Sequence, residues 1–263
     1  MITVYSQNVW NCPPASYRNT LIRSLVSDVN PDICMFQECG PFTVRAAKIA
    51  LPDLMKDVYV EACAHLADRN FTPIYYKRNK YDLVDSGYFL FDGLNDSNSK
   101  SVTWIVLEEK GTSVKCAFVS THFWWKFDSE KDNQQRLENV DQLYEICNFI
   151  IEKYNVPVII GGDLNNGKNS DQGEEPYEYM KQKGFNDIRL SAEETTDEYT
   201  HHDYPILNEN EIYENGPMPV RNLDYIFTYG DYNINVKKFD IITSQNALNS
   251  SDHCPLIGKL EII

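Results

Sequence analysis

The chain has 263 residues, of which 42% are hydrophobic and 24% charged, the composition of an ordinary globular protein rather than of a disordered, collagen-like or coiled-coil chain. No apolar run approaches the ~18 residues of a membrane helix, so no transmembrane segment is expected. The 24 basic and 39 acidic side chains give a formal net charge of −15, which disfavours binding to duplex nucleic acid or an anionic membrane surface.

The N-terminal part of the chain predicts alternating strands and helices. Residues 2–9 are β-branched and aromatic, as in a buried strand. Apolar residues at helical spacing over 21–29 predict a helix that ends before Pro31. Residues 32–38 form a short apolar run that ends in a carboxylate, and a weaker helical pattern covers 46–54.

The middle of the chain is mostly predicted as strands. These strands cover residues 74–76, 83–91, 102–107 and 114–122. The polar stretch 92–101 is predicted as a loop between two of them.

The C-terminal part begins with a long amphipathic helix, predicted from apolar spacing over 137–151. Further strands are predicted at 156–160, 223–228, 236–243 and 256–262, and the polar stretches 165–176 and 191–222 are predicted to be irregular. Because no linker or repeat divides the sequence, a single α/β domain over 1–263 is expected.

The cysteines and the N-terminus favour a cytoplasmic protein. The seven cysteines are odd in number, include no C-x-x-C pair, and mostly lie in apolar strings, where cysteine acts as a small core residue. The segment Met1–Tyr5 lacks the basic and apolar regions of a signal peptide. A reducing compartment is therefore expected.

Polar residues gather where the predicted apolar strands begin or end. They are Asn8, Glu38, His122, Asp163, Asn165, Asp224, Asp252 and His253. Taken alone, an Asp or Asn there is more often a turn residue or a helix cap, and a lone His is more often a hydrogen-bonded core or surface group. The functional interpretation therefore depends on the whole set, since strand ends build rigid sites in layered α/β folds.

The order of the motifs resembles that of a known family. They are Gln7–Trp10, Phe36–Glu38, Ser120–His122, Gly162–Asn165, Leu223–Phe227 and Ser251–Pro255. Together they are similar to the endonuclease/exonuclease/phosphatase superfamily over nearly the whole chain. The resemblance implies a four-layer αββα sandwich of the α/β (α+β) class, with two mixed β-sheets face to face, helices outside and the site at one rim.

A closer resemblance is to an uncharacterised bacterial branch of small hydrolases in this superfamily. Ile74–Lys77, Asp85–Gly87, Thr200–His202 and Arg136 match its pattern. The chain departs from that branch at Ser120–Trp125, where the branch usually reads Asn-Thr-His-Leu. This departure lies beside the expected site and is expected to affect the substrate.

The resemblance implies hydrolysis of a phosphate ester by an activated water. It assigns Glu38 as the principal metal ligand, with Asn8 and Asp252 nearby, and carboxylates are hard ligands suited to Mg²⁺ or Mn²⁺.

The implied catalytic residues are Asp163, His253, His122, Asn165 and Asp224. Asp224 would orient His253, whereas Asn165 and His122 would contact the phosphate or leaving group. Either Asp163 or His253 could be the general base.

Candidate substrate-binding residues come from three segments. Phe123, Trp124, Trp125 and Phe127 follow His122 and are interpreted either as core or as a wall against the substrate.

His201 and His202 are interpreted either as a solvated loop or, from the resemblance, as part of a loop that closes over the site. Arg136 is either a phosphate clamp or an ordinary helix-surface residue.

Three functions remain open at this point. The first is a Mg²⁺- or Mn²⁺-dependent phosphoesterase acting on a small or lipid-like phosphate ester. The second is a metal-dependent nuclease on DNA or RNA, disfavoured by the acidic charge and by Trp10-Asn11, where abasic-site enzymes usually read Asn-Gly. The third is a non-catalytic binding protein of the same fold. No protein partner is predicted.

Overall fold

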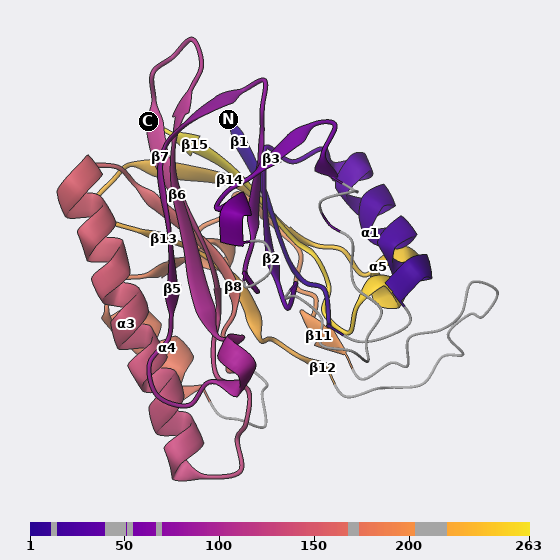
Figure 1. Ribbon diagram of the computed structural model, residues 1–263, viewed down its shortest axis with the longest axis vertical. Helices are drawn as coiled ribbons and strands as arrows, with labels where there is room; N and C mark the ends of the chain where they lie inside the picture. Colours follow the sequence, from indigo (N-terminus) through magenta and orange to yellow (C-terminus); the bar gives the residue numbers. More distant parts are fainter. Residues whose placement is uncertain (12–14, 40–50, 52–54, 67–69, 168–173, 203–219) are drawn as a thin grey trace.

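The computed structural model describes residues 1–11, 15–39, 51, 55–66, 70–167, 174–202 and 220–263. Two large β-sheets pack against each other, and helices cover their outer faces (Figure 1). Both sheets combine parallel and antiparallel pairs, since β1 with β2 and β7 with β8 are parallel and most other neighbours are antiparallel. The predicted sandwich of two mixed sheets is confirmed.

The first sheet has the strand order β10 (Glu194–Thr195), β14 (Ile234–Ile241), β15 (Leu256–Ile262), β1 (Ile2–Asn8), β2 (Ile33–Gln37), β4 (Ile74–Lys77) and β3 (Tyr59–Glu61). The second has the order β5 (Tyr81–Leu90), β6 (Ser101–Glu109), β7 (Lys115–His122), β8 (Val158–Asp163), β13 (Asp224–Tyr229) and β9 (Asn186–Asp187). A small hairpin pairs β11 (His201–His202) with β12 (Val220–Arg221).

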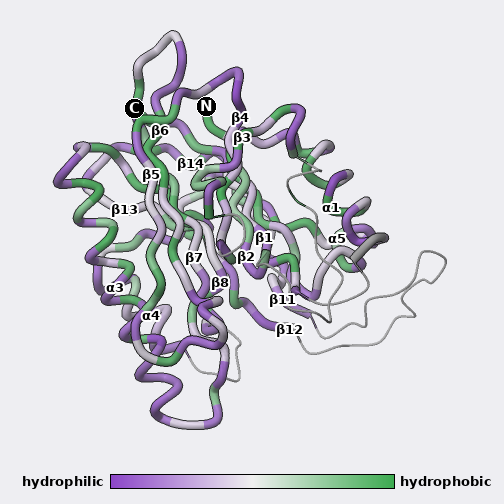
Figure 2. Tube along the Cα trace, in the orientation of Figure 1, coloured by the Kyte–Doolittle hydropathy of each residue, from purple (hydrophilic) through white to green (hydrophobic). Residues whose placement is uncertain are grey.

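Three apolar cores separate the four layers. The central core lies between the sheets and joins residues such as Val4 and Met35 of the first sheet to Phe118 and Ile159 of the second. Figure 2 shows green, hydrophobic stretches along strands of both sheets. Alternating side chains of each strand point to opposite faces, so each sheet also has an outer apolar face that a helix must cover.

Helices cover these outer faces on opposite sides of the molecule (Figure 1). On one side, α1 (Ala15–Val29) packs Ile22 and Val26 against the first sheet, and α5 (Gln245–Ser250) lies beside α1. On the other side, α3 (Glu130–Tyr154) packs Leu143 and Cys147 against the second sheet, with α4 (Glu175–Gln182) next to it.

Most predicted elements are present with shifted ends. The long helix begins at Glu130, where the Ser129 side chain accepts a hydrogen bond from the Asp132 amide as an N-terminal cap. The described part of 191–222 is not wholly irregular, because it contains β10, β11 and β12. The helix predicted over 46–54 lies outside the described residues, apart from residue 51.

Strand register brings the predicted site residues to one edge. His122 of β7 is paired with Asp163 of β8, and Asp224 of β13 is paired with the same Asp163 from the other side. In the first sheet, Asn8 of β1 is paired with Gln37 of β2, so Glu38 follows directly. The ends of five strands therefore build the site.

The two sheets approach each other closely near this edge. A Cβ added to Gly161 would lie 2.8 Å from Ser6 Oγ of the opposite sheet, so only glycine allows this approach. The side-chain nitrogen Nε2 of Gln37 donates to Ser120 Oγ at 3.1 Å, and Ser120 Oγ donates to the Phe36 carbonyl at 2.9 Å. These polar links fix the sheets relative to each other where the site begins.

Among the described helices, none is both long and apolar enough to cross a membrane. The described cysteines are free thiols, and five of these six are buried.

Candidate active site

Asp163 lies at the centre of the candidate site. Its side chain is 1% exposed, and Oδ1 accepts a hydrogen bond from the Asn165 amide at 2.7 Å. Oδ2 accepts from Asn8 Nδ2 at 2.9 Å and lies 3.4 Å from His122 Nε2 and 3.8 Å from His253 Nε2. The carboxylate therefore joins residues of both sheets.

The histidines around Asp163 keep it ionised. Burial by itself raises the pKa of the Asp163 carboxyl, but the charge of His253 and the contact with His122 outweigh burial and hold this pKa below its ordinary value. Asp163 is thus a carboxylate at neutral pH.

His253 is held by a buried carboxylate. Its Nδ1 lies 2.8 Å from Asp224 Oδ2, and both residues are buried. Burial raises the pKa of Asp224 to about 6. Burial lowers the pKa of His253, but Asp224, Asp252 and Asp163 outweigh it and raise this pKa well above the ordinary value. At neutral pH the raised pKa of His253 keeps a proton on its ring beside the Asp224 carboxylate, with Nε2 facing Asp163.

Asn165 and His122 form a second polar pair beside Asp163. Asn165 Nδ2 lies 3.0 Å from His122 Nε2 and donates to the Phe123 carbonyl at 3.1 Å. Burial and then the charge of Lys100 lower the pKa of His122, so its ring is neutral at neutral pH. Both side chains therefore offer dipoles without net charge.

Lys100 was missed by the sequence analysis. It directly precedes β6, is 4% exposed, and places Nζ 2.9 Å from His122 Nε2 and 3.2 Å from Nδ1. Burial lowers the pKa of Lys100, whereas Glu38, Asp163 and Asp96 act in the opposite direction. Its only sequence signal was a lysine just before an apolar strand, and that pattern is common on protein surfaces.

Glu38 lies at the edge of this group with 28% of its side chain exposed. Oε1 accepts from Asn8 Nδ2 at 3.2 Å, and Oε2 accepts from the Asn11 amide at 3.0 Å. The backbone at Trp10, Glu38 and Asn165 has φ between 47° and 60°, a region that non-glycine residues rarely adopt. Such conformations cluster at functional sites, where the surrounding structure enforces them.

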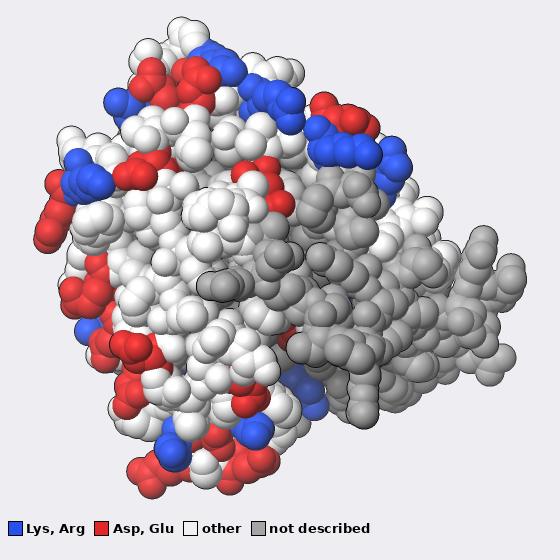
Figure 3. All heavy atoms as spheres, viewed as in Figure 1, with Lys and Arg blue, Asp and Glu red and all other residues white. Residues whose placement is uncertain are grey.

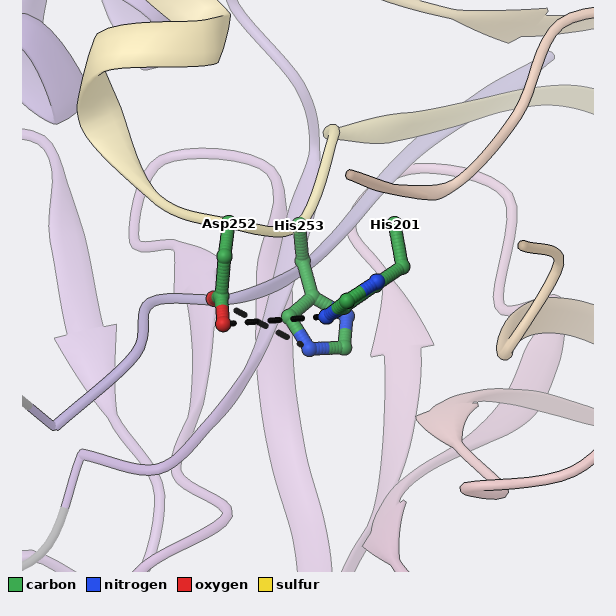
Figure 4. A group of neighbouring side chains, drawn as sticks. All are labelled: His201, Asp252 and His253. Carbon is green, nitrogen blue, oxygen red and sulfur yellow. Dashed lines mark ion pairs between the residues drawn. The ribbon is translucent and has the colours of Figure 1, made fainter. Parts of the chain in front are cut away.

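Asp252, His201 and His253 form the other side of the site. Figure 4 shows the Asp252 carboxylate facing both imidazoles, and its oxygens lie 3.7 Å from His201 Nε2 and 3.9 Å from His253 Nε2. The His201 and His253 rings cross at 79° with centroids 4.7 Å apart.

His201 and His202 are not in a solvated loop. Both are buried, and the His202 amide donates to the Asp252 carbonyl at 2.9 Å, while His202 Nε2 lies 2.9 Å from the Ser251 carbonyl oxygen. The interpretation as a solvated loop is wrong because β11 pairs with β12 and bridges His253. His201 lies in the site, whereas His202 packs behind it.

A cleft of about 160 Å³ opens beside Glu38, Lys100 and His122. Trp125 forms part of its wall with 46% of its surface exposed, and its indole nitrogen donates to Asp96 at 2.7 Å. Trp125 therefore faces the open cleft.

Trp124 and Arg136 are not among the residues that line this cleft. Both are buried, and the Trp124 indole nitrogen donates to Asp132 at 2.7 Å. Arg136 donates to the Lys126 carbonyl. These contacts tie the segment after β7 to helix α3, so the described contacts of both residues are structural.

The residues present fit a divalent cation. Two groups have donor atoms within 4.8 Å of one another: His201, Asp252 and His253 in one, and Asp163, Asp224 and His253 in the other. His201 Nδ1 is buried and makes no hydrogen bond within the described part of the chain. Glu38 belongs to neither group but offers a partly exposed carboxylate. Several converging carboxylates are the donor set of a hard cation.

Comparison with known proteins identifies the family. The model of the Endonuclease/Exonuclease/phosphatase family matches residues 5–253, and the chain belongs to this family. A search of curated proteins found no match.

Solved structures share the fold over their full length. A mannosyl-6-phosphatase of Bacteroides thetaiotaomicron is 20% identical with a TM-score of 0.72, and 100% of each chain is covered. An endonuclease/exonuclease/phosphatase of Bacteroides vulgatus is 21% identical with a TM-score of 0.75, covering 100% of this chain and 99% of that one. TDP2 of D. rerio, complexed with a single-strand DNA product, is 17% identical with a TM-score of 0.69, covering 99% and 98%.

Proposed function

We propose that this protein hydrolyses phosphate esters with a divalent metal ion, Mg²⁺ or Mn²⁺, and an activated water. The observation that carries the proposal is the convergence of Asp163, the His253–Asp224 pair and the Asn165–His122 pair at one rim. A partly exposed Glu38 lies beside them.

The ligands proposed for the metal are Glu38, Asn8 and Asp252, with the His201 ring beside Asp252. When bound, the ion supplies positive charge to the phosphoryl and leaving oxygens. The chain's own carboxylates would otherwise repel a phosphate.

The protonation states support Asp163 as the general base. Water forms the new bond to phosphorus and gives its proton to the Asp163 carboxylate, while the ester P–O bond breaks and the leaving oxygen takes a proton from solvent. His253 already holds a proton, so it suits neutralisation of the developing phosphate charge rather than proton abstraction.

The charge of the molecule supports a small or lipid-like substrate over duplex nucleic acid. Acidic side chains gather along the side occupied by α3 and α4 on the face shown in Figure 3. The similar mannosyl-6-phosphatase supports a small phosphate ester. The similar TDP2 keeps single-stranded nucleic acid as the alternative substrate. The intact acid and imidazole set counts against a non-catalytic binding protein.

The test is hydrolysis of p-nitrophenyl phosphate and bis-p-nitrophenyl phosphate with Mg²⁺ or Mn²⁺. We expect release of nitrophenol that EDTA abolishes, that added metal restores, and that Glu38→Gln reduces by at least about 10²-fold. Asp231→Asn, which removes an exposed carboxylate on the β13–β14 turn, should leave the rate unchanged.

Two results would contradict the proposal. The first is metal-independent release, and the second is no release from these esters or from single-stranded oligonucleotides with either metal.

A cytoplasmic location stays a prediction.

A further inference from the structure

Lys100 is a buried cation that lines the cleft of the candidate active site. It is 4% exposed, and within the described residues no carboxylate oxygen lies within 4.0 Å of its Nζ. Burying an ammonium group without an ion pair is strongly unfavourable, because the charge loses its hydration. An ammonium group buried at the wall of the cleft is therefore suited to bind an anionic ligand.

The position of this cation is built into the fold. The Lys100 amide donates to Asn95 Oδ1 at 2.9 Å, and the Lys100 carbonyl accepts from Asn95 Nδ2 at 2.8 Å. Asn95 Nδ2 also donates to the Phe91 carbonyl at 3.0 Å. The backbone of Lys100 is therefore clamped at the start of β6, so its side chain extends from a rigid base.

The ammonium group ends beside the residues proposed to contact phosphate. In the described structure Nζ donates to the His122 ring, which lies 3.0 Å from Asn165 Nδ2. An ammonium has three N–H donors, so donors remain for a ligand in the cleft. Lys100, His122 and Asn165 form a continuous hydrogen-bonded row that ends in the ammonium group.

The charges in this row are unequal. Neutral His122 and the Asn165 amide offer dipoles that serve any phosphate ester, whereas Lys100 adds a full positive charge. A fixed cation attracts a dianion about twice as strongly as a monoanion at the same distance. At pH 8 a phosphomonoester is a dianion, since its second pKa is about 6, and a phosphodiester is a monoanion.

We propose that Lys100 binds a non-bridging oxygen of the substrate phosphate and makes the enzyme select phosphomonoesters over phosphodiesters. This inference rests on the proposed hydrolase function and names its substrate class. It assigns Lys100 a specificity-determining role.

The experiment compares kcat/KM for p-nitrophenyl phosphate and bis-p-nitrophenyl phosphate at pH 8 with Mn²⁺. In Lys100→Met we expect the monoester value to fall about 10- to 100-fold, the range for loss of a charge-assisted hydrogen bond. The diester value should fall less, by about 3- to 10-fold, because the attraction to a monoanion is about half as strong. Lys100→Arg, which retains the charge, should keep most of the monoester preference.

Two further proteins control for folding and charge. Methionine is an apolar side chain of similar length, and replacing a buried charge with one is often neutral for stability, which thermal unfolding of Lys100→Met would check. Lys110→Met removes a half-exposed lysine of the β6–β7 turn that pairs with Asp82, so it should leave both kcat/KM values unchanged.

Calorimetry with inorganic phosphate and Mg²⁺-loaded protein at pH 8 separates this inference from the proposed function. Wild type should bind phosphate about tenfold more tightly than Lys100→Met. That result together with no ester hydrolysis would sustain the role of Lys100 in anion binding and reject the hydrolase. Parallel losses on both esters, or phosphate binding by wild type no tighter than by Lys100→Met, would overturn the inference.

Discussion

The two sides of the candidate active site are positioned by different kinds of interaction. One side, the strand-end group, consists of Asn8, Glu38, His122, Asp163 and Asn165, which end or follow paired strands of the two sheets. The other side, the turn group, consists of His201, His202, Asp252 and His253, which lie on a two-residue strand and on the turn before β15.

Sheet register brings the strand-end group together. His122 and Asp163 are neighbours because β7 and β8 are parallel and paired residue by residue. By contrast, Thr200 and Ser251 position the turn group. Thr200 Oγ1 accepts from the Leu223 and Asp224 amides, and Ser251 Oγ donates to the Asn8 carbonyl. Substitutions near the strand-end group should therefore disturb its geometry little. Loss of an individual hydrogen bond should displace the turn group.

The largest effect is expected within the strand-end group, at Asp163. Asp163→Asn keeps the size of the side chain but removes the proposed proton acceptor, so kcat should fall by about 10²- to 10⁴-fold, the size of a general-base contribution. Steady-state hydrolysis of p-nitrophenyl phosphate measures it. Thermal unfolding should show a folded protein because the strand pairing is unchanged. A loss below tenfold would rule out Asp163 as the base.

The free energy of unfolding should fall at acidic pH because of His202, a member of the turn group. Burial lowers the pKa of His202 to about 4 from its ordinary 6.5. Between these two values the unfolded chain binds a proton that the native chain does not, so stability is lost as the pH falls through this window. The loss is up to about 3 kcal/mol.

Urea unfolding between pH 7 and 4 tests this expectation. His202→Gln should lose less stability over that window than wild type. His65→Gln, which replaces an exposed histidine, should follow the wild-type curve. Identical curves for wild type and His202→Gln would remove His202 as the cause.

A smaller effect on catalysis is expected from Ser251, the residue that ties the turn group to β1. Its Oγ donates to the Asn8 carbonyl at 2.7 Å and accepts from the His253 amide at 3.2 Å. Ser251→Ala should lower kcat by about tenfold with KM little changed, and should lower the free energy of unfolding by about 1–2 kcal/mol. Ser191→Ala, at an exposed serine, is the control. Unchanged kcat would show that sheet packing suffices to place His253.

The smallest effect is expected at Trp125, beside the strand-end group. Trp125→Ala removes a wall of the cleft, so KM for 1-naphthyl phosphate should rise about 3- to 10-fold, whereas KM for methyl phosphate should change less than about twofold. The contrast between the two substrates isolates contact with the organic group. Equal changes for both would place Trp125 outside the substrate-binding surface.

Local sequence patterns predicted the strand-end group well. Alternating or continuous apolar runs located β1, β2, β7 and β8. The polar residue that ends or directly follows each run then identified a site residue. The same reasoning was less informative for His201 and His202, since two adjacent polar residues in a polar stretch do not reveal that β11 is covered. Their burial depends on a bridge to His253, which is 52 positions from His201 (253 − 201).

The aromatic run after His122 shows the same limit. Sequence could not separate Trp124, which is 4% exposed and bound to Asp132, from Trp125, which is 46% exposed at the cleft. Their difference arises from where helix α3 packs, and hydrophobicity carries no information about that. Arg136 is likewise buried, and it donates to the Lys126 carbonyl.

The sequence by itself determined the long strands, the motifs and the family, because each motif and each long strand is a pattern of residues close together in the chain. Only the tertiary structure decided which charges meet. Lys100 and His122 are 22 positions apart, and Asn8 and Asp163 are 155 apart. Their contacts exist because β6 pairs with β7 and because the two sheets pack closely at Gly161. The interaction between two charges depends on their distance in space and not on their separation along the chain. The protonation states of the site residues therefore follow from the packed fold.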